Sequence, residues 1–345
     1  RHKDPRERIF CAPGNAGTEG IARNLPFDPE NPKAVVAACV ELGIGLVVVG
    51  PEAPLAAGVV DALLASGIPA FGPTRKAAAL ESSKAFARAF SERHRVPCAR
   101  TERFSGLAAL ERYLDANRGA RIVLKKSGLA AGKGVLESDD RNELQSFGEA
   151  VLASDELLAE EYLVGRELSV FALCDGSDRL VLPPCADHKK AGAGDTGPNT
   201  GGMGAICPVP FADAALMARI EREIIDPSFE GMAEEGLAYR GVLFFGVMVT
   251  AEGPKLLEYN VRFGDPETQS LVPLIASGPL GLCEATATGR LGSQKPTFST
   301  DTACGVVIAA PGYPASYPKG LAVDLSRAEA AVQAGLPEID TDGIP

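Results

Sequence analysis

The sequence predicts a protein of mixed α/β and α+β class, in which a small parallel α/β unit precedes a larger region of antiparallel strands. Residues 9–72 alternate short apolar segments with helical patterns, which is typical of a parallel sheet. Further along, glycine-rich turns near residues 128–134 and 252–254 each join two apolar segments, as expected of antiparallel hairpins. A chain of 345 residues is long enough for two or three such units.

The composition excludes several classes of protein. The net charge of −11 disfavours a broad grip on nucleic acid or on an anionic membrane, because both partners require a cationic surface. The eight cysteines are scattered and never form a CxxC pair, which argues against a zinc site or a disulfide framework and indicates a reducing cytoplasm. No apolar run has the length of a membrane span, and no leader is recognisable. The first residue is Arg1 rather than Met, so we expect a truncated start.

The N-terminal unit is predicted from local signals. Asn31 can cap a helix that Gly43 ends, and the branched residues at 46–50 indicate a strand buried on both faces. Strands are also expected at residues 9–12 and 69–71, and a second helix at residues 59–66.

Glu52 is a candidate site residue of this unit. It stands in a predicted loop, residues 50–58, beyond the carboxyl end of a strand, where ligands of open α/β sheets bind. An equally weighted alternative is that Pro51 and Pro54 only shape a turn there.

The segment VLKKSGLAAGKGV, residues 123–135, carries a phosphate-binding pattern. Its glycines allow backbone N–H groups to approach an anion, and its lysines supply positive charge. We expect one long helix over residues 74–94, containing Lys84, before this segment, and two adjacent antiparallel strands on either side of the loop. A Walker loop is excluded, because that loop leads from a strand into a helix with a different glycine spacing.

Glu160 and Glu161 stand where one predicted strand of the segment 157–173 gives way to a linker. They fit an adenosine clamp in which a carboxylate accepts the ribose hydroxyls. Two solvated acids at a strand end are about as well supported, because exposed acids are the rule.

Residues 187–205 hold six glycines in a stretch that we expect to be too broken for any helix or strand. Apolar segments flank it on both sides, so a substrate-binding loop is favoured over a disordered excursion. A scaffold helix is then expected over residues 213–235, kinked by Pro227.

The returning strand of a hairpin that turns at residues 252–254 alternates apolar and polar side chains. Period two places Glu258, Asn260 and Arg262 on one face. Carboxylate and amide oxygens suit Mg²⁺, which takes few protein ligands, and Arg262 can hold a phosphoryl oxygen. The alternative, a plain polar outer face, is weakened because FGDPET follows at once.

Together these motifs resemble the phosphoribosylamine–glycine ligase family of the ATP-grasp superfamily. The matching segments follow the family's order over nearly the whole chain: APGNAGT, VVGPEAPLAAGVVDAL, GLAAGKGV, DHK, DTGPNTGGMGA and NVRFGDPETQ. The resemblance implies an ATP-grasp fold with an N-terminal Rossmann-like α/β domain and apparently truncated ends. The implied domains are residues 1–75, which bind substrate, 76–292, with a lid near 97–165, and 293–345, which begin a C-terminal domain.

The resemblance also implies which residues act. Catalysis would involve Arg262 and Lys125, and Mg²⁺ or Mn²⁺ would be held by Glu258 and Asn260. The implied ATP-binding residues are Lys84, Lys125, Gly128, Ala130, Ala131, Gly132, Lys133, Gly134, Glu160, Glu161 and Glu167. The implied contacts to the other two substrates are Asn15, Gly17, Glu52, Asp187, His188, Lys189, Asp195, Asn199, Thr200, Gly201, Gly202, Met203, Gly204, Asp265 and Glu267.

The implied reaction joins glycine to 5-phosphoribosylamine through a glycyl phosphate in purine biosynthesis, and we expect a cytoplasmic monomer. The chain departs from the family at Lys126, Ser127 and Ser82, and Gly246 stands where many ATP-grasp enzymes have another metal carboxylate. Because both ends look truncated, a non-catalytic ATP-binding module remains an alternative. A carboxylase or another ATP-grasp ligase is a third.

Overall fold

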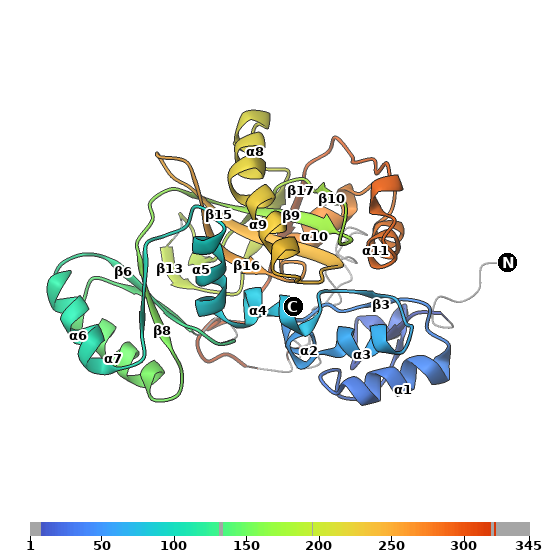
Figure 1. Cartoon of the computed structure of the whole chain (residues 1–345), viewed down its shortest axis with the longest axis horizontal. Coiled ribbons are helices and arrows are strands. Elements are labelled where there is room, and N and C mark those ends of the chain that lie inside the picture. The colour runs from blue at the N-terminus through green and yellow to red at the C-terminus, as the bar shows by residue number, and fades with distance from the viewer. Residues whose placement is uncertain (1–7, 131–133, 195, 319–320, 322–345) are drawn as a thin grey trace.

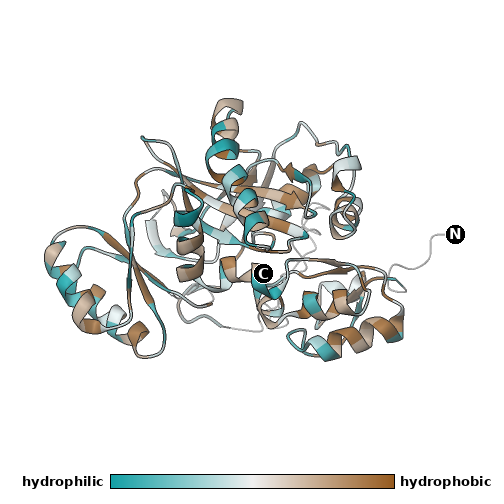
Figure 2. Ribbon diagram, viewed as in Figure 1, coloured by the Kyte–Doolittle hydropathy of each residue, from teal (hydrophilic) through white to brown (hydrophobic). Residues whose placement is uncertain are grey.

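The computed structural model describes residues 8–130, 134–194, 196–318 and 321. The N-terminal α/β unit and a small subdomain around α6 and α7 lie at opposite ends of a central sheet (Figure 1). Apolar residues follow the strands, whereas the helices carry mixed polar and apolar residues (Figure 2). Within the described ranges, no helix combines the length and the apolar character that crossing a membrane requires.

The N-terminal unit confirms the expected alternation of helices and parallel strands. Its strands pair as β1 with β2 and β3 with β4, and both pairs are parallel. Asn31 accepts hydrogen bonds from the backbone N–H groups of Lys33 and Ala34, and Gly43 ends the first helix at a φ of 64°. The elements are β1 (Phe10–Cys11), β2 (Arg23–Asn24), α1 (Pro32–Leu42), β3 (Val47–Val48), α2 (Glu52–Ala57), α3 (Val59–Ala65) and β4 (Ala70–Phe71).

Two details of this unit differ from the prediction. Residues 50–58 do not form a plain loop, because α2 begins at Glu52. The strand at 46–50 is not buried on both faces, since Val48 is 48% exposed. Among the described strands β3 pairs with β4 alone.

The expected continuous helix over residues 74–94 is wrong. The chain forms α4 (Arg75–Ser82) and α5 (Lys84–Arg93), which are separated at Ser83. Ser83 is extended, with φ −139° and ψ 105°, and forms an antiparallel bridge with Gly128. This break places Lys84 in the first turn of a new helix, directly beside the glycine-rich loop.

A four-stranded antiparallel sheet carries that loop. Its order is β5-β8-β6-β7, so the loop does join two adjacent antiparallel strands, β6 and β7. Helices α6 and α7 pack on it with a small core of their own, which includes Leu110, Leu124, Leu144 and Leu157. The elements are β5 (Thr101–Phe104), α6 (Leu107–Ala116), β6 (Ile122–Lys126), β7 (Val135–Ser138), α7 (Arg141–Leu152) and β8 (Leu157–Glu161).

The central sheet is also antiparallel, with the order β10-β9-β15-β16. Its side chains alternate between two cores: Val170 and Phe245 belong to one, and Phe171 and Phe244 to the other. Helices cover both faces, so the sheet is buried on each side. The elements are β9 (Arg166–Cys174), β10 (Arg179–Val181), α8 (Ala214–Ile220), a π-helical turn (Glu221–Ile225), α9 (Asp226–Glu234), β15 (Gly241–Val249), β16 (Pro254–Asn260), α10 (Glu267–Leu271) and α11 (Pro279–Ala287). The helix expected over 213–235 is confirmed as one continuous helical run over residues 214–234, with the π-helical turn just before Pro227.

The prediction that residues 187–205 form no strand is wrong. Glycines at positive φ, such as Gly194 at 70° and Gly202 at 134°, bend the chain between short strands without steric cost. The hairpin of β12 and β13 projects from a three-stranded sheet in the order β11-β14-β17. The strands are β11 (Ala186–Asp187), β12 (Lys190–Gly192), β13 (Thr196–Asn199), β14 (Gly204–Cys207) and β17 (Ala303–Val306).

Candidate functional site

Lysines from three different segments surround Glu258 on β16. Removal from water raises the energy of the Glu258 carboxylate, but the charges of Lys189, Lys125 and Lys84, with a hydrogen bond from Asn260, hold its pKa below the usual range. Burial, together with the charge of Lys125, lowers the pKa of Lys84, which Glu258 partly offsets. The cluster is therefore a set of ionised groups facing one another where the two antiparallel sheets meet.

Glu258 and Asn260 lie side by side as their spacing predicts. The Asn260 amide donates to Glu258 Oε1 at 3.5 Å. Gly246 faces Glu258 across the β15–β16 pair, and a Cβ there would lie 3.1 Å from Glu258 Cγ. The glycine that replaces an expected second carboxylate thus leaves room for the Glu258 side chain.

These two residues fit a divalent cation that takes most of its ligands from a substrate. In the part of the chain that the structure describes, no group of three or more His, Cys, Asp or Glu side chains could hold a metal. An ionised carboxylate beside an amide is the small oxygen set that Mg²⁺ accepts when phosphate oxygens complete its shell. The lysines nearby would contact the same phosphates.

Glu160, predicted to contact adenosine, is buried and paired with two cations in the structure. Its side chain is 2% exposed, and both carboxylate oxygens are engaged by cations. Arg88 Nε donates to Oε1 at 2.6 Å, and Lys125 Nζ lies 2.7 Å from Oε2. Burial opposes the charge, but Lys125 and Arg88 hold the pKa of Glu160 below the usual range. The sequence identified the residue but not these partners, because Arg88 lies 72 positions away; a contact of Glu160 with adenosine stays a prediction.

The neighbouring acids are more accessible. Glu161 accepts from Arg100 Nε at 2.7 Å and lies 3.5 Å from Lys255 Nζ. Glu167 pairs with Lys189 at 3.0 Å, and its side chain is 44% exposed. Of the two, only Glu167 pairs with a lysine of the cluster.

Arg262 lies just beyond the end of β16 rather than on it. Its guanidinium lies 3.3 Å from both Glu52 Oε2 and Glu81 Oε1. Glu81, from α4, also accepts the backbone N–H of Val261 at 2.7 Å. Burial raises the pKa of Glu81 to about 7 despite the charge of Arg262. Sequence reasoning missed Glu81, although its position three residues before Lys84 was visible.

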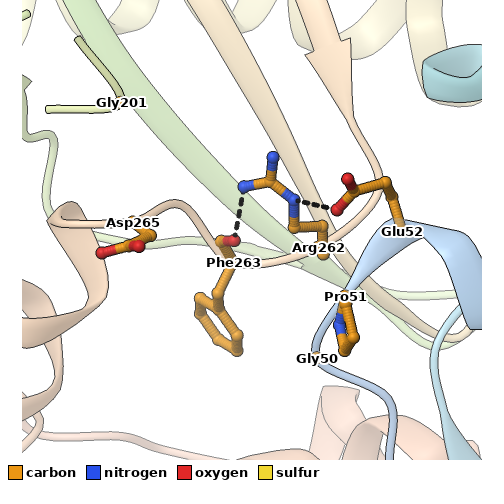
Figure 3. A pocket seen from close by; sticks show the side chains of 7 residues that line it. All are labelled: Gly50, Pro51, Glu52, Gly201, Arg262, Phe263 and Asp265. Carbon is orange, nitrogen blue, oxygen red and sulfur yellow. Dashed lines mark hydrogen bonds and ion pairs between the residues drawn. The ribbon is translucent and has the colours of Figure 1, made fainter. Parts of the chain in front are cut away.

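A cavity of about 480 Å³ opens beside Arg262. Figure 3 shows Arg262 paired with Glu52 at one side of it, with Asp265 and Gly201 on the other side. The walls come from the N-terminal unit, the 187–205 segment and the segment after β16. The lining residues are Gly50, Pro51, Glu52, Gly201, Arg262, Phe263 and Asp265. The structure thus brings together three of the predicted substrate-binding segments.

An acidic pair lies behind this cavity. Glu267 accepts from Ser169 Oγ at 2.7 Å, whereas Asp187 Oδ1 is buried without a hydrogen-bond partner among the described residues. Burial and the charge of Glu267 raise the pKa of Asp187 to about 7. Gly202 is required here, because its Cβ would lie 2.9 Å from Asp187 Oδ1 and 2.3 Å from Pro266 Cδ.

The rest of the 187–205 segment borders a second cavity of about 290 Å³, which His188 and Lys190 line. Lys189 accepts through its carbonyl from Thr200, and the backbone N–H of Met203 donates to His188. Asn199 ends β13, and Gly204 begins β14.

Of the predicted substrate residues, only Glu52, Gly201 and Asp265 are among the described residues that line the first cavity, and Asn15 and Gly17 lie at the start of the chain. Asn15 accepts the backbone N–H of Thr18 at 3.0 Å, and Gly17 precedes the short 3₁₀ turn Thr18–Gly20. Both residues shape the first turn of the chain, and neither lines the cavity of Figure 3.

The base of the glycine-rich loop is fastened to α5. The Ser127 carbonyl accepts the N–H of Lys84 at 2.9 Å, and its hydroxyl accepts the N–H of Ala85 at 3.2 Å. Gly128 donates to Asp155 Oδ2 at 3.2 Å. Lys126 is 3.8 Å from the same carboxylate, so its extra charge faces Asp155. Ala130 and Gly134 bound the described loop, whereas Ala131, Gly132, Lys133 and Asp195 lie outside the described residues.

Two family models together match residues 1–268 of the chain. A model described as the N domain of phosphoribosylglycinamide synthetase matches residues 1–81, and one described as its ATP-grasp (A) domain matches residues 82–268.

Individual relatives agree with these matches. A phosphoribosylamine–glycine ligase of Brucella melitensis is 44% identical over 330 residues, which are 94% of this chain and 77% of that protein. A trifunctional purine biosynthetic protein, adenosine-3, of Gallus gallus is 42% identical over 94% of this chain and 33% of its own. The crystal structure of phosphoribosylamine–glycine ligase from Thermotoga maritima aligns with a TM-score of 0.78 at 33% identity, over 91% of this chain and 77% of that one.

Proposed function

Because the chain belongs to the phosphoribosylglycinamide synthetase family of ATP-dependent ligases, we propose that it joins glycine to 5-phosphoribosylamine. The products are glycinamide ribonucleotide, ADP and phosphate, in purine biosynthesis. The observation that carries the proposal is the cluster of Lys84, Lys125 and Lys189 around Glu258, next to the cavity beside Arg262.

The lysine cluster supports an ATP site between the two antiparallel sheets. Lys84 and Lys125 would neutralise phosphate oxygens, and the N–H groups around Gly128 and Gly134 would approach them closely. Glu161 and Glu167, whose side chains are 23% and 44% exposed, are more accessible than Glu160 and would contact adenosine. The side-chain oxygens of Glu160 are paired with Arg88 and Lys125.

Glu258 and Asn260 would hold the divalent cation, Mg²⁺ or Mn²⁺, which when bound supplies charge neutralisation between the phosphates. The low pKa of Glu258 keeps its carboxylate ionised and ready for this. Arg262, steadied by Glu52 and Glu81, would hold an oxygen of the transferring phosphoryl group.

The cavity beside Arg262 would receive the acyl acceptor, and the Asp187–Glu267 pair lies where glycine's ammonium group could bind. In the first step the glycine carboxylate attacks the γ-phosphorus, and ADP leaves. In the second step the amine attacks the acyl carbon, and phosphate leaves. The side chains form no covalent bond; they position the reactants and neutralise charge.

The domain assignment extends this proposal: residues 1–75 bind the sugar phosphate, 76–292 bind ATP, and 293–345 begin a further unit. We also propose that the protein is a monomer and works in the cytoplasm.

The reaction is tested by measuring phosphate release from ATP with glycine and 5-phosphoribosylamine, each omitted in turn. We expect release only when both are present. Calorimetry with ATP and Mg²⁺ is run in parallel. Binding of ATP without glycine-dependent turnover would contradict the ligase and favour a non-catalytic nucleotide-binding module.

The metal assignment is tested with Glu258→Gln. Loss of the carboxylate removes the charged ligand, so we expect the Mg²⁺ concentration for half-maximal activity to rise about tenfold or more. Glu252→Gln is the matched control, because Glu252 lies exposed on the turn of the same hairpin. An unchanged Mg²⁺ dependence of Glu258→Gln would remove this residue from the metal site.

A further inference from the structure

Arg88 is a buried cation to which the proposed reaction gives no task. It lies on α5, one turn beyond Lys84, and is 4% exposed. A buried arginine is costly unless its charge and its N–H groups are satisfied, because transfer out of water removes its hydration. The partners of Arg88 therefore indicate why the fold retains it.

Arg88 reaches both antiparallel sheets. Its Nε and Nη2 donate to the two oxygens of Glu160 on β8, at 2.6 and 3.0 Å. Its Nη1 and Nη2 also donate to the carbonyls of Leu256 and Leu257 on β16, at 3.1 and 2.5 Å. Leu257 directly precedes Glu258, so one guanidinium spans from the strand of the metal carboxylate to the acid beside Lys125.

The charges in this network show how the Arg88–Glu160 pair affects Lys125. Glu160 lies 2.7 Å from Lys125 Nζ, so a lone Glu160 would neutralise that lysine. Arg88 balances the glutamate through a bidentate pair, which leaves one net positive charge on the trio. Lys125 Nζ also lies 3.5 Å from the Leu257 carbonyl, which keeps the ammonium group next to β16.

We propose that Arg88 is a positioning residue that neutralises Glu160 and so leaves the charge of Lys125 available to an anionic phosphate. The inference rests on the proposed ATP site. It assigns Glu160 a structural rather than a ligand-binding role, and it makes the contact between α5 and β16 part of the nucleotide site.

The test is calorimetric binding of ATP with Mg²⁺ to the full chain and its variants. Arg88→Met should weaken ATP binding about tenfold or more, because Glu160 then pairs with Lys125 alone. Adding Glu160→Gln to Arg88→Met should restore the affinity to within about threefold of the parent, since Lys125 regains its net charge. A purely structural role of Arg88 would leave the double variant as weak as the single one.

The control is Arg103→Met, because Arg103 forms an exposed pair with Glu92 of the same helix α5. It should bind ATP like the parent. Should Arg88→Met fail to fold, Arg88→Gln removes the same charge, keeps a donor for Glu160, and carries the same expectation and the same rescue. Unchanged ATP affinity in the folded charge-removing variant, or no rescue by Glu160→Gln, overturns the proposal.

This readout is separate from the ligase reaction. A parent that binds ATP but shows no glycine-dependent turnover would refute the proposed function while the binding series still decides the role of Arg88. A fully active parent whose Arg88→Met variant binds ATP normally would refute only the role of Arg88.

Discussion

The two four-stranded antiparallel sheets differ in how they are covered. The central sheet, β10-β9-β15-β16, places Val170 and Phe245 in one core and Phe171 and Phe244 in another. The outer sheet, β5-β8-β6-β7, has one small core under α6 and α7, and Val135 on its edge strand is 44% exposed. One sheet is a doubly covered scaffold, and the other is a thin layer with its own core.

This difference shows how the proposed ATP site is held together. Lys125 belongs to the thin sheet and Glu258 to the scaffold, and the cores of the two sheets are separate. Polar contacts between them set the spacing: the Arg88 network and the pair of Lys255 with Glu161. The site therefore depends on polar contacts more than on a shared apolar core, and the predictions below test this division.

The largest effect is expected in the scaffold. Phe245 is fully buried and packs edge-on against Phe229 and Tyr259. Phe245→Ala should lower the free energy of global unfolding by about 3–5 kcal/mol, measured by chemical denaturation. Leu124→Ala, its counterpart in the thin sheet, should instead increase amide hydrogen exchange within β5 to β8 and leave exchange in β15 unchanged. Faster amide hydrogen exchange in both sheets of the Leu124→Ala variant would show that the two sheets unfold as one unit.

The next effect concerns Glu81, which holds the end of β16 from α4. Its pKa is raised by burial to about 7, from an ordinary value of 4.5. Between these pH values the folded chain keeps a proton that the unfolded chain has lost, so the free energy of unfolding falls as pH rises and stays lower above pH 7. Glu81→Gln should abolish the fall in the free energy of unfolding that Glu81 causes, and should raise that free energy at pH 8 by on the order of 2–3 kcal/mol.

The measurement is thermal or urea unfolding of Glu81→Gln from pH 5 to pH 8. Asp187, whose pKa is also raised to about 7, leaves a residual slope of the same sign. Glu92→Gln serves as control, since Glu92 is exposed on α5. If Glu81→Gln is no more stable than the parent at pH 8, the ionised Glu81 does not destabilise the folded chain as its raised pKa implies.

The smallest effect is expected at Ser127, where the thin sheet meets α5. Ser127→Ala removes the acceptor for the N–H of Ala85 and should destabilise this contact by about 1 kcal/mol, seen as faster exchange of that amide. Ser127→Asp keeps an acceptor and should retain protection. Equal exchange of the Ala85 amide in Ser127→Ala and in the parent would show that the start of α5 does not need this hydrogen bond.

The parts of the fold that the sequence predicted depend on local signals. Asn31 and Gly43 bound α1 through contacts within a few residues. The two-residue alternation in β16 places Glu258 beside Asn260 for the same reason. The loop between β6 and β7 was predicted from glycines and lysines that are adjacent in the chain.

The parts that could not be predicted depend on distant partners. The break between α4 and α5 is set by Gly128, which bridges Ser83 across 45 positions of the sequence. The partner of Glu160 is an arginine on a helix whose pattern looks like ordinary core and surface. The hairpin in residues 187–205 could not be predicted, because glycines indicate a turn but do not determine which short segments pair.

The contact of Ser127 with the start of α5 also bears on the order in which the molecule folds. Ser127 reaches Ala85 across 42 positions, and Arg88 reaches Leu256 across 168. Contacts of such large sequence separation must close long loops first, so they form late in folding. The start of α5, with Lys84, therefore gains its final environment only after β6 and β16 are in place. In a nascent or misfolded chain the proposed phosphate site is not assembled, so nucleotide binding would measure completed folding.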